Sequence, residues 1–319
     1  MIGRTATRAV HLEIGRYILY IGFAAVFVFF AVVLYDRSFL TIGNLTNIAR
    51  QTAMISIMAI GFTFVMSAGE IDLSIGAVVA LSSLVTALAL RDYGIWLALP
   101  AGLGTGILIG FINGVLTTRV RIPSFLVTLG TLGVVNGLAR WITDLKSVPV
   151  TNERYNFVFG SGDIGPVPIL FVWTGVALLI GHVALRKTAF GRQALATGGS
   201  RTAALYSGVK VDRIKLLALV ISATAAALAG MLYAGRLHGA RYTLGEADLL
   251  TVIAAVVIGG TSLFGGKGSV VGAVIGSLIM GVINNGLILM GLSVAQQMMF
   301  QGIIIILAVS LTSREAARR

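Results

Sequence analysis

Two carboxylates, Glu70 and Asp72, lie two positions apart between long apolar stretches, in a chain that has only 12 acidic residues. Carboxylates at such a place could carry a proton or a sodium ion, because ionisable groups within a membrane are costly and usually functional. They could instead be structural, with Asp72 or Ser74 capping the start of the next helix, whose free amide groups attract an anion. We prefer the helix-start role and keep an ion-coupled secondary transporter that uses Glu70 and Asp72 as the alternative.

Four asparagines form a second set of polar residues within apolar runs: Asn113, Asn136, Asn284 and Asn285. An amide group in the hydrocarbon region needs a hydrogen-bond partner, because water is absent there. One interpretation is that these side chains bond neighbouring helices to one another. The other is that they line a route for a polar solute, and on that interpretation the four are candidate pathway residues.

Enzymatic chemistry has little support in the sequence. Cysteine is absent, which excludes thiolate nucleophiles, disulfides and cysteine-based metal sites. The segment TSLFGGKGS (261–269) resembles a phosphate-binding loop, but Thr261 replaces its first glycine and Gly268 its last hydroxyl residue. No histidines are spaced as a metal-binding pair. We therefore expect neither an enzyme nor a resident metal or cofactor on this chain.

The composition is that of an integral membrane protein, because 57% of the residues are hydrophobic and only 11% are charged. We expect an all-α polytopic fold of about ten spans, some short or broken, in a single domain over 1–319 with its helical bundle over 17–311. The apolar segments are 17–35, 48–68, 74–90, 95–117, 125–142, 167–185, 215–235, 249–264, 270–290 and 294–311. Glycines recur every four residues at 102, 106, 110 and 114, which predicts closely packed helices.

The basic residues orient these spans. If ten spans leave both termini inside, sixteen of the 24 Lys and Arg residues fall on the cytoplasmic side, as the positive-inside rule requires. Residues 1–16 are then a cytoplasmic tail, 186–215 is the main cytoplasmic loop and 143–166 is a periplasmic loop. The net charge of +12 is explained by this topology, and we expect contact with membrane lipid and none with nucleic acid.

The cytoplasmic loop contains a short predicted helix. In GGSRTAALYSGV (198–209), Ser200 is a possible N-cap and Gly208 is placed to end the helix. A helix of about seven residues is unstable alone, so it must dock against something. It is either a partner-binding coupling helix or a surface helix that rests on lipid headgroups.

Two segments suggest an internal repeat. GILIGFINGVL (106–116) resembles GSLIMGVINNGL (276–287), and both are rich in small residues and asparagine. Two halves of five spans each would have opposite orientations, which predicts a possible inverted five-plus-five repeat.

Three segments together resemble one family: GEIDLSIGAVVALSS, FGRQALATGGSRTAALYSGV and AAVVIGGTSLFGGKGSVVGAVIGSLIMGVINNGL. They are similar to the membrane permease subunits of bacterial sugar ABC importers of the ribose, xylose and arabinose type, from about residue 45 to 310. Glu70 departs from the family pattern, where many members have glycine, and Ser200 and Arg201 stand in place of a frequent Asn-Pro.

The resemblance implies a chain that forms the translocation pathway for a monosaccharide or related polar solute, in the bacterial inner membrane. It implies three partners: a cytoplasmic ATPase subunit that holds ATP and Mg, a periplasmic sugar-binding protein, and a second permease copy in a homodimer, with a heterodimer as the alternative. The residues it places against the ATPase are Arg192, Gly199, Ser200, Arg201, Ala203 and Gly208.

Overall fold

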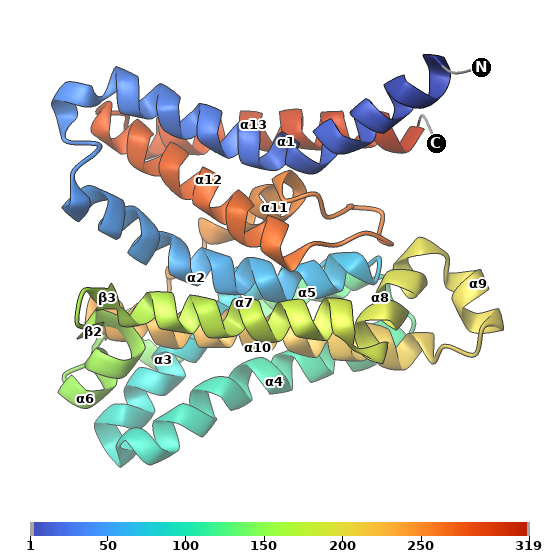
Figure 1. Ribbon diagram of the computed structural model, residues 1–319. Helices are drawn as coiled ribbons and strands as arrows, with labels where there is room; N and C mark the ends of the chain where they lie inside the picture. Colours follow the sequence, from blue (N-terminus) through green and yellow to red (C-terminus); the bar gives the residue numbers. More distant parts are fainter. Residues whose placement is uncertain (1–2, 318–319) are drawn as a thin grey trace.

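The computed structural model is described for the backbone of residues 3–317 and for the side chains of residues 17, 19–307 and 310 (Figure 1). It is almost entirely helical over these residues. Ten helices are apolar: α1 (Gly3–Val33), α2 (Ile42–Ser67), α3 (Ile75–Tyr93), α4 (Ile95–Thr118), α5 (Ser124–Thr143), α7 (Ile169–Lys187), α10 (Val211–Leu237), α11 (Asp248–Ile258), α12 (Val270–Leu289) and α13 (Val294–Ala317). They correspond one to one with the ten predicted segments, and the all-α polytopic class is confirmed.

Seven of the apolar helices in the described residues are long enough to cross a membrane, and three apolar stretches are shorter. The shortest is α11, which has 11 residues and is therefore about 16 Å long, roughly half the thickness of a hydrocarbon core. The predicted span 249–264 was too long. The helix ends at Ile258 because Gly259 and Gly260 follow, and Gly260 has a φ of +85°, which a helix cannot continue.

The small elements gather at the two ends of the bundle. At one end lie α8 (Ala189–Gly199) and α9 (Arg201–Tyr206), together with both ends of the chain (Figure 1). At the other end lie η1 (Tyr35–Arg37), α6 (Glu153–Asn156), η2 (Phe157–Ser161) and two antiparallel pairs, β1 (Val148–Pro149) with β4 (Gly239–Ala240) and β2 (Asp163–Ile164) with β3 (Val167–Pro168). We call these the α9 end and the α6 end.

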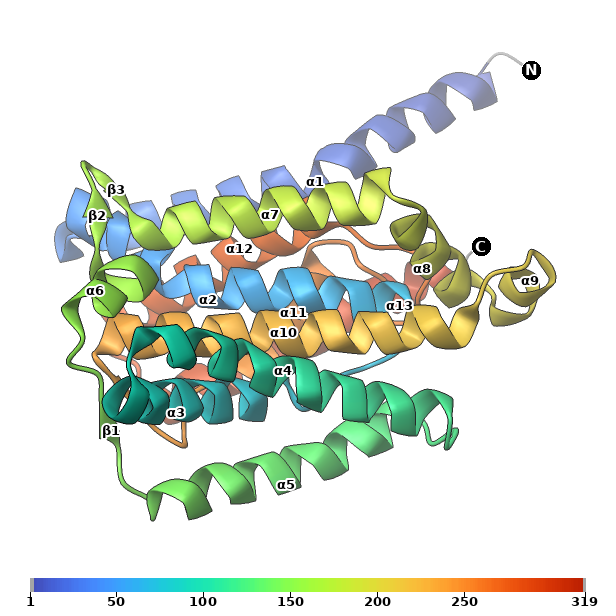
Figure 2. The ribbon, with the colours of Figure 1, turned by 90° about the horizontal axis from the view of Figure 1, so that it is seen from below.

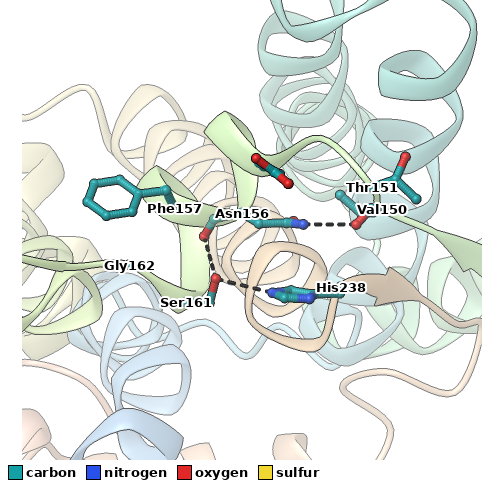
Figure 3. Close-up of a pocket in the computed structure, with 8 residues that line it drawn as sticks. Val150, Thr151, Asn156, Phe157, Ser161, Gly162 and His238 are labelled. Carbon is teal, nitrogen blue, oxygen red and sulfur yellow. Dashed lines mark hydrogen bonds between the residues drawn. The ribbon is translucent and has the colours of Figure 1, made fainter.

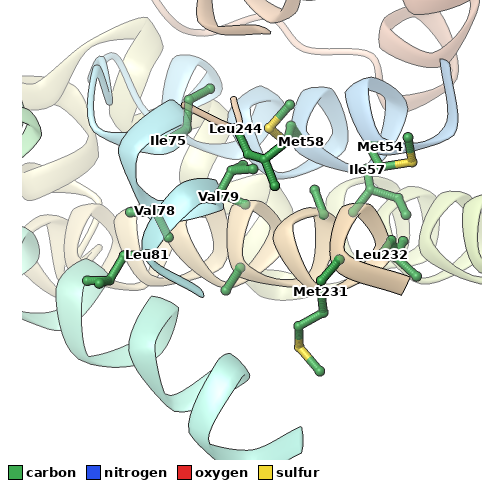
Figure 4. Packing of buried hydrophobic residues seen from close by; sticks show 14 of the residues in the cluster. Met54, Ile57, Met58, Ile75, Val78, Val79, Leu81, Met231, Leu232 and Leu244 are labelled. Carbon is green, nitrogen blue, oxygen red and sulfur yellow. The ribbon is translucent and has the colours of Figure 1, made fainter. Parts of the chain in front are cut away.

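The core of the bundle surrounds α2 and α10, which pack against each other and run in opposite directions (Figure 2). Small residues permit the close approach: a Cβ on Gly61 of α2 would lie 2.5 Å from the Cβ of Ala225 on α10. The predicted glycine packing on α4 is confirmed, since a Cβ on Gly110 would lie 2.7 Å from the Cα of Val220. Figure 4 shows the apolar side chains that fill the space between α2, α3 and α10, including Met54, Ile57, Met58, Val78, Val79, Met231 and Leu232.

The helix contacts are reciprocal between the two halves of the chain. Helix α10 packs on α3 and α4 of the first half, and α2 packs on α11 and α12 of the second half. In the same way α3 contacts α5, and α11 contacts α13. With α2 and α10 antiparallel, this exchange of partners is the arrangement that an inverted five-plus-five repeat produces.

Candidate functional site at the α9 end

Helices α8 and α9 are built by short capping interactions. Thr188 begins α8, its hydroxyl accepting a hydrogen bond from the amide of Gly191 at 3.2 Å. Ser200 separates the two helices and caps α9 by accepting from the amide of Ala203 at 3.3 Å. Gly208 follows α9 with a φ of +79°. The predicted N-cap at Ser200 and the predicted glycine stop at Gly208 are therefore confirmed, although α9 has six residues instead of seven.

The face presented by α8 and α9 is open to a partner. All six predicted coupling residues are exposed: Arg192, Gly199, Ser200, Arg201, Ala203 and Gly208. Arg201 approaches Asp212 only at 4.0 Å, and both side chains are more than half exposed, so this ion pair contributes little. Tyr206 is 90% exposed at the end of α9. The structure brings these residues together on one projecting surface, and their role against an ATPase stays a prediction.

The C-terminal end of α8 is wedged between two turns of the bundle. We call this contact the glycine junction, and its members are Ser67, Gly69, Gly198, Gly199, Gly265 and Gly266. The amide of Gly266 donates to the carbonyl of Ser67 at 3.1 Å, which joins the α11–α12 loop to the end of α2. Gly198 lies against both, because a Cβ there would meet the Ser67 carbonyl and would lie 2.6 Å from the Gly266 nitrogen.

Glycine is required on the other side of the junction as well. Gly265 and Gly266 have φ values of +82° and +76°, a region that glycine enters without strain. A Cβ on Gly265 would lie 2.7 Å from the Cα of Gly198, and one on Gly266 would lie 2.7 Å from the Cα of Gly199. The three segments therefore meet backbone to backbone, with no flexible side chain between them.

Glu70 and Asp72 lie in the turn that continues from the junction to α3. Glu70 forms an ion pair with Lys215 near the start of α10, and the two side chains are 9% and 17% exposed. The pair therefore ties the turn to α10. Since the two partners lie far apart in the chain, the sequence alone does not reveal it.

Asp72 is fully buried and organises the start of α3. Its Oδ1 accepts from the amide of Ser74 at 3.0 Å and from the Ser74 hydroxyl at 2.6 Å. Ser74 precedes α3, but its hydroxyl does not accept a helix amide, so the helix-start role belongs to Asp72 and not to a Ser74 cap. The second Asp72 oxygen and the Ser222 hydroxyl are both buried without a partner in the described residues.

Two of the four asparagines join distant helices through two hydrogen bonds each. Asn113 donates to Ser74 at 3.1 Å and accepts from Thr131 at 2.6 Å, which extends the Asp72 network to α4 and α5. Asn285 and Asn44 exchange two hydrogen bonds, at 2.9 and 3.0 Å. Both asparagines therefore act as helix-to-helix bonds in this chain.

The other two asparagines differ from each other. The Asn284 side-chain oxygen accepts from Gln301 at 3.0 Å. The Asn136 side-chain oxygen, on α5, is buried with no partner in the described residues. Asn136 is thus the one of the four whose side-chain oxygen has no donor in the described part of the chain.

No group of three or more His, Asp or Glu side chains in the described part of the chain is placed to hold a metal ion. The arrangement at the α9 end can transmit motion. The exposed surface of α8 and α9 lies in front of the glycine junction, and the buried polar network of Asp72 begins at the turn that continues from this junction to α3.

Residues 44–309 match a family model described as branched-chain amino acid transport system, permease component. The chain is 41% identical to the ribose import permease protein RbsC of Bacillus subtilis, over 88% of each chain. It is 38% identical to the D-allose transport system permease protein AlsC of Escherichia coli, over 86% of this chain and 84% of that one. It is 33% identical to the L-arabinose transport system permease protein AraH of E. coli, over 92% and 89% respectively. No solved structure matches significantly.

The family match covers the helices from α2 to α13 and includes the whole glycine junction. The relatives align over most of their own length as well as over most of this chain. From these matches and the apolar helices of the bundle, we conclude that the chain is a multi-pass membrane protein of the transport-system permease family, with sugar import permeases among its relatives.

Proposed function

We propose that this chain is the membrane-spanning subunit of an ABC importer and forms the translocation pathway for a monosaccharide. A separate ATPase subunit, which binds ATP and Mg, drives it from the cytoplasm. The printed names of the relatives, which concern ribose, allose and arabinose, support a sugar substrate. Their range leaves polyols and nucleosides as related candidates.

The glycine junction is the observation that carries this proposal. A partner that pushes the exposed surface of α8 and α9 also pushes Gly198, which contacts the carbonyl of Ser67 and the amide of Gly266. Packed backbones transmit displacement because they have no free space into which to relax. Motion of α8 and α9 therefore reaches the starts of α3 and α12 together, and these helices belong to opposite halves of the bundle.

Charge supports the direction of transport. The α9 end carries the segments with the most Lys and Arg, so it faces the cytoplasm of a bacterial inner membrane and both termini lie there. The α6 end then faces the periplasm, where a soluble sugar-binding protein delivers the substrate.

The pathway itself lies between two permease copies, with a homodimer as the simplest assembly. Helix α5 is set apart from the rest of the bundle in Figure 2. Its glycines at 130, 133 and 137 face open space, because a Cβ at any of them would have no atom within 4 Å, so another helix can approach closely there. Asn136 on the same helix has an oxygen without a donor in the described residues, which suits it to a polar route better than the three bonded asparagines.

Reconstituted uptake tests the proposal. Vesicles that contain the permease, its ATPase and the sugar-loaded binding protein should accumulate one or a few sugars from a panel of pentoses, hexoses, polyols and nucleosides, and only with ATP. An ATPase variant unable to hydrolyse ATP is the control. Uptake driven by a proton or sodium gradient without the ATPase would contradict the proposal and favour an ion-coupled transporter.

The coupling surface has its own test. Scrambling residues 199–207 should abolish co-purification of the ATPase while the bundle stays folded. A scrambled variant that still binds the ATPase and transports at the wild-type rate would remove α9 from the mechanism.

A further inference from the structure

A polar pocket of about 510 Å³ opens at the α6 end, far from the glycine junction (Figure 3). The segment that follows β1, helix α6, η2 and the residue that follows α10 form its walls. The residues that line it are Val150, Thr151, Glu153, Asn156, Phe157, Ser161, Gly162 and His238.

The walls of this pocket are held in place by specific bonds. The Tyr155 phenol donates to the carbonyl of Met231 at 2.8 Å and is buried, which raises its pKa far above the ordinary value and keeps it a donor. Its ring stacks on Phe159 at a centroid distance of 4.9 Å. Val150, just after β1, donates its amide to the carbonyl of His238, just after α10, at 2.9 Å. The pocket is therefore preformed.

The wall of the pocket contains one buried amide oxygen that lacks a donor. Asn156 is only 6% exposed, and its amide nitrogen donates to the carbonyl of Val150 at 2.9 Å. Its side-chain oxygen is buried and has no partner in the described residues. Two of the nearby polar groups are already engaged, because the Ser161 hydroxyl donates to the backbone carbonyl of Asn156 at 3.3 Å and lies 3.1 Å from the His238 Nε2. The Thr151 hydroxyl also lines the pocket and is exposed.

Glu153 adds an unpaired negative charge. Four other carboxylates at this end have ion-pair partners within the chain: Asp163 with Arg50, Asp144 with Lys146, Glu246 with Arg140, and Asp92 with Arg91. Glu153 has none among the described residues. The pocket thus combines a free carboxylate with an amide oxygen that lacks a donor.

We propose that this pocket receives a lysine or arginine side chain of the soluble sugar-binding protein when that protein docks at the α6 end. A basic side chain brings only donors, which the exposed Glu153 carboxylate can accept. Phe157 lines the same pocket and is 51% exposed, so its ring can also contact the cation. A free sugar fits less well, because its hydroxyl groups need donors as well as acceptors. The inference rests on the proposed function.

The test compares two carboxylates at the same end. Permease and ATPase, assembled in nanodiscs, are titrated with the sugar-loaded binding protein for wild type, Glu153→Gln and Asp36→Asn. Asp36, in η1, is exposed, has no ion pair among the described residues and does not line the pocket. We expect Glu153→Gln to weaken binding about tenfold and to reduce its salt dependence, and Asp36→Asn to change it less than about twofold. Unchanged melting temperatures and co-purification with the ATPase establish that both variants are folded.

Carbodiimide cross-linking identifies the guest. In wild type it should join Glu153 to one lysine of the binding protein, and reversing both charges at that pair should restore binding. If the guest is an arginine, which does not cross-link in this way, a scan of arginine-to-glutamate variants of the binding protein against Glu153→Lys should reveal the restoring pair.

Three results overturn the inference. Equal affinities for wild type and Glu153→Gln would show that the pocket takes no part in docking. If Glu153→Gln abolished the binding of a free monosaccharide to the permease and left docking of the binding protein unchanged, the pocket would be a sugar site. The inference would also fail if no charge-reversed pair of residues restored binding. If the wild-type permease binds no sugar-binding protein at all, the proposed function fails instead.

Discussion

Gly198 is the residue at which the glycine junction can be disturbed with least change elsewhere. Its φ lies outside the left-handed region, so alanine is not strained by the backbone at this position. The added Cβ would lie 2.6 Å from the Gly266 nitrogen and would meet the Ser67 carbonyl even more closely. Ordinary contact begins at 3.4 Å, so the Gly266 nitrogen must retreat by about 0.8 Å and the Ser67 carbonyl by more.

Overpacking of this kind costs about 1–3 kcal/mol. Gly198→Ala should therefore lower the melting temperature by about 5 °C in detergent, measured by intrinsic tryptophan fluorescence. It should also reduce uptake per ATP hydrolysed, because the displaced α8 moves with the ATPase but transmits less of that motion to α3 and α12. The ATPase should still co-purify, since the exposed surface of α9 is unchanged.

Gly199→Ala is the matched control for Gly198→Ala. A Cβ at this neighbouring position would meet only the Cα of Gly266, at 3.7 Å, which is an ordinary contact. It should keep the wild-type melting temperature, which does not depend on the contact predicted between Gly199 and the ATPase. The reasoning is refuted if the two alanine variants lower the melting temperature equally.

Three further predictions concern the residues around the junction. Glu70→Gln should destabilise the fold by about 3 kcal/mol, because it leaves the largely buried Lys215 without its partner, and a second change, Lys215→Met, should recover much of the loss in thermal unfolding. Asp72→Asn should keep most ATP-driven uptake, because its side-chain oxygen can still accept from Ser74, whereas Asp72→Leu should lose about 2–4 kcal/mol of stability and most uptake. Ser200→Ala should cost about 1 kcal/mol by removing the α9 cap and should weaken ATPase co-purification, whereas Ser207→Ala should not.

Each of these predictions has an outcome that contradicts it. If Lys215→Met deepens the Glu70→Gln defect, the two side chains do not form the pair. A complete loss of uptake in Asp72→Asn with normal stability would favour an ion-coupled carboxylate. If Ser200→Ala and Ser207→Ala retained the ATPase equally well, the α9 cap would not be needed for binding the ATPase.

The spans were predictable because the bilayer dictates their length and composition. An apolar run of about 20 residues crosses the membrane whatever its neighbours are. The end of α11 was misplaced because the predicted span continued through Gly259 and Gly260 to the apolar Leu263 and Phe264, whereas the conformation of Gly260 ends the helix before them. Local capping at Ser200 and Gly208 was also predictable, since each depends on residues a few positions away.

The junction was not predictable as a contact. Its three segments are recognisable separately, but nothing local to Gly69, Gly198 or Gly265 indicates that they meet. The ion pair of Glu70 and Lys215 was not predictable for the same reason, because its two residues meet only after distant helices have packed together. Of these three glycines only Gly198 lies where the backbone conformation does not require glycine, and a glycine at such a position indicates that another backbone approaches closely.

A distance measurement within one permease copy tests most directly whether the glycine junction moves as a unit. Because the chain has no cysteine, Ser207→Cys, just after α9, and Phe264→Cys, on the α11–α12 loop, can be spin-labelled alone; both side chains are exposed. Labelled copies are diluted with unlabelled ones so that each assembly carries one pair, and a second sample labelled only at Ser207 reports the distance between copies. We predict that ATP binding changes the distance between copies and leaves the Ser207 to Phe264 distance unchanged within about 1 Å, because packed interiors transmit displacement. A change of several ångströms between Ser207 and Phe264 would show that α9 moves independently of the loop and would contradict the account.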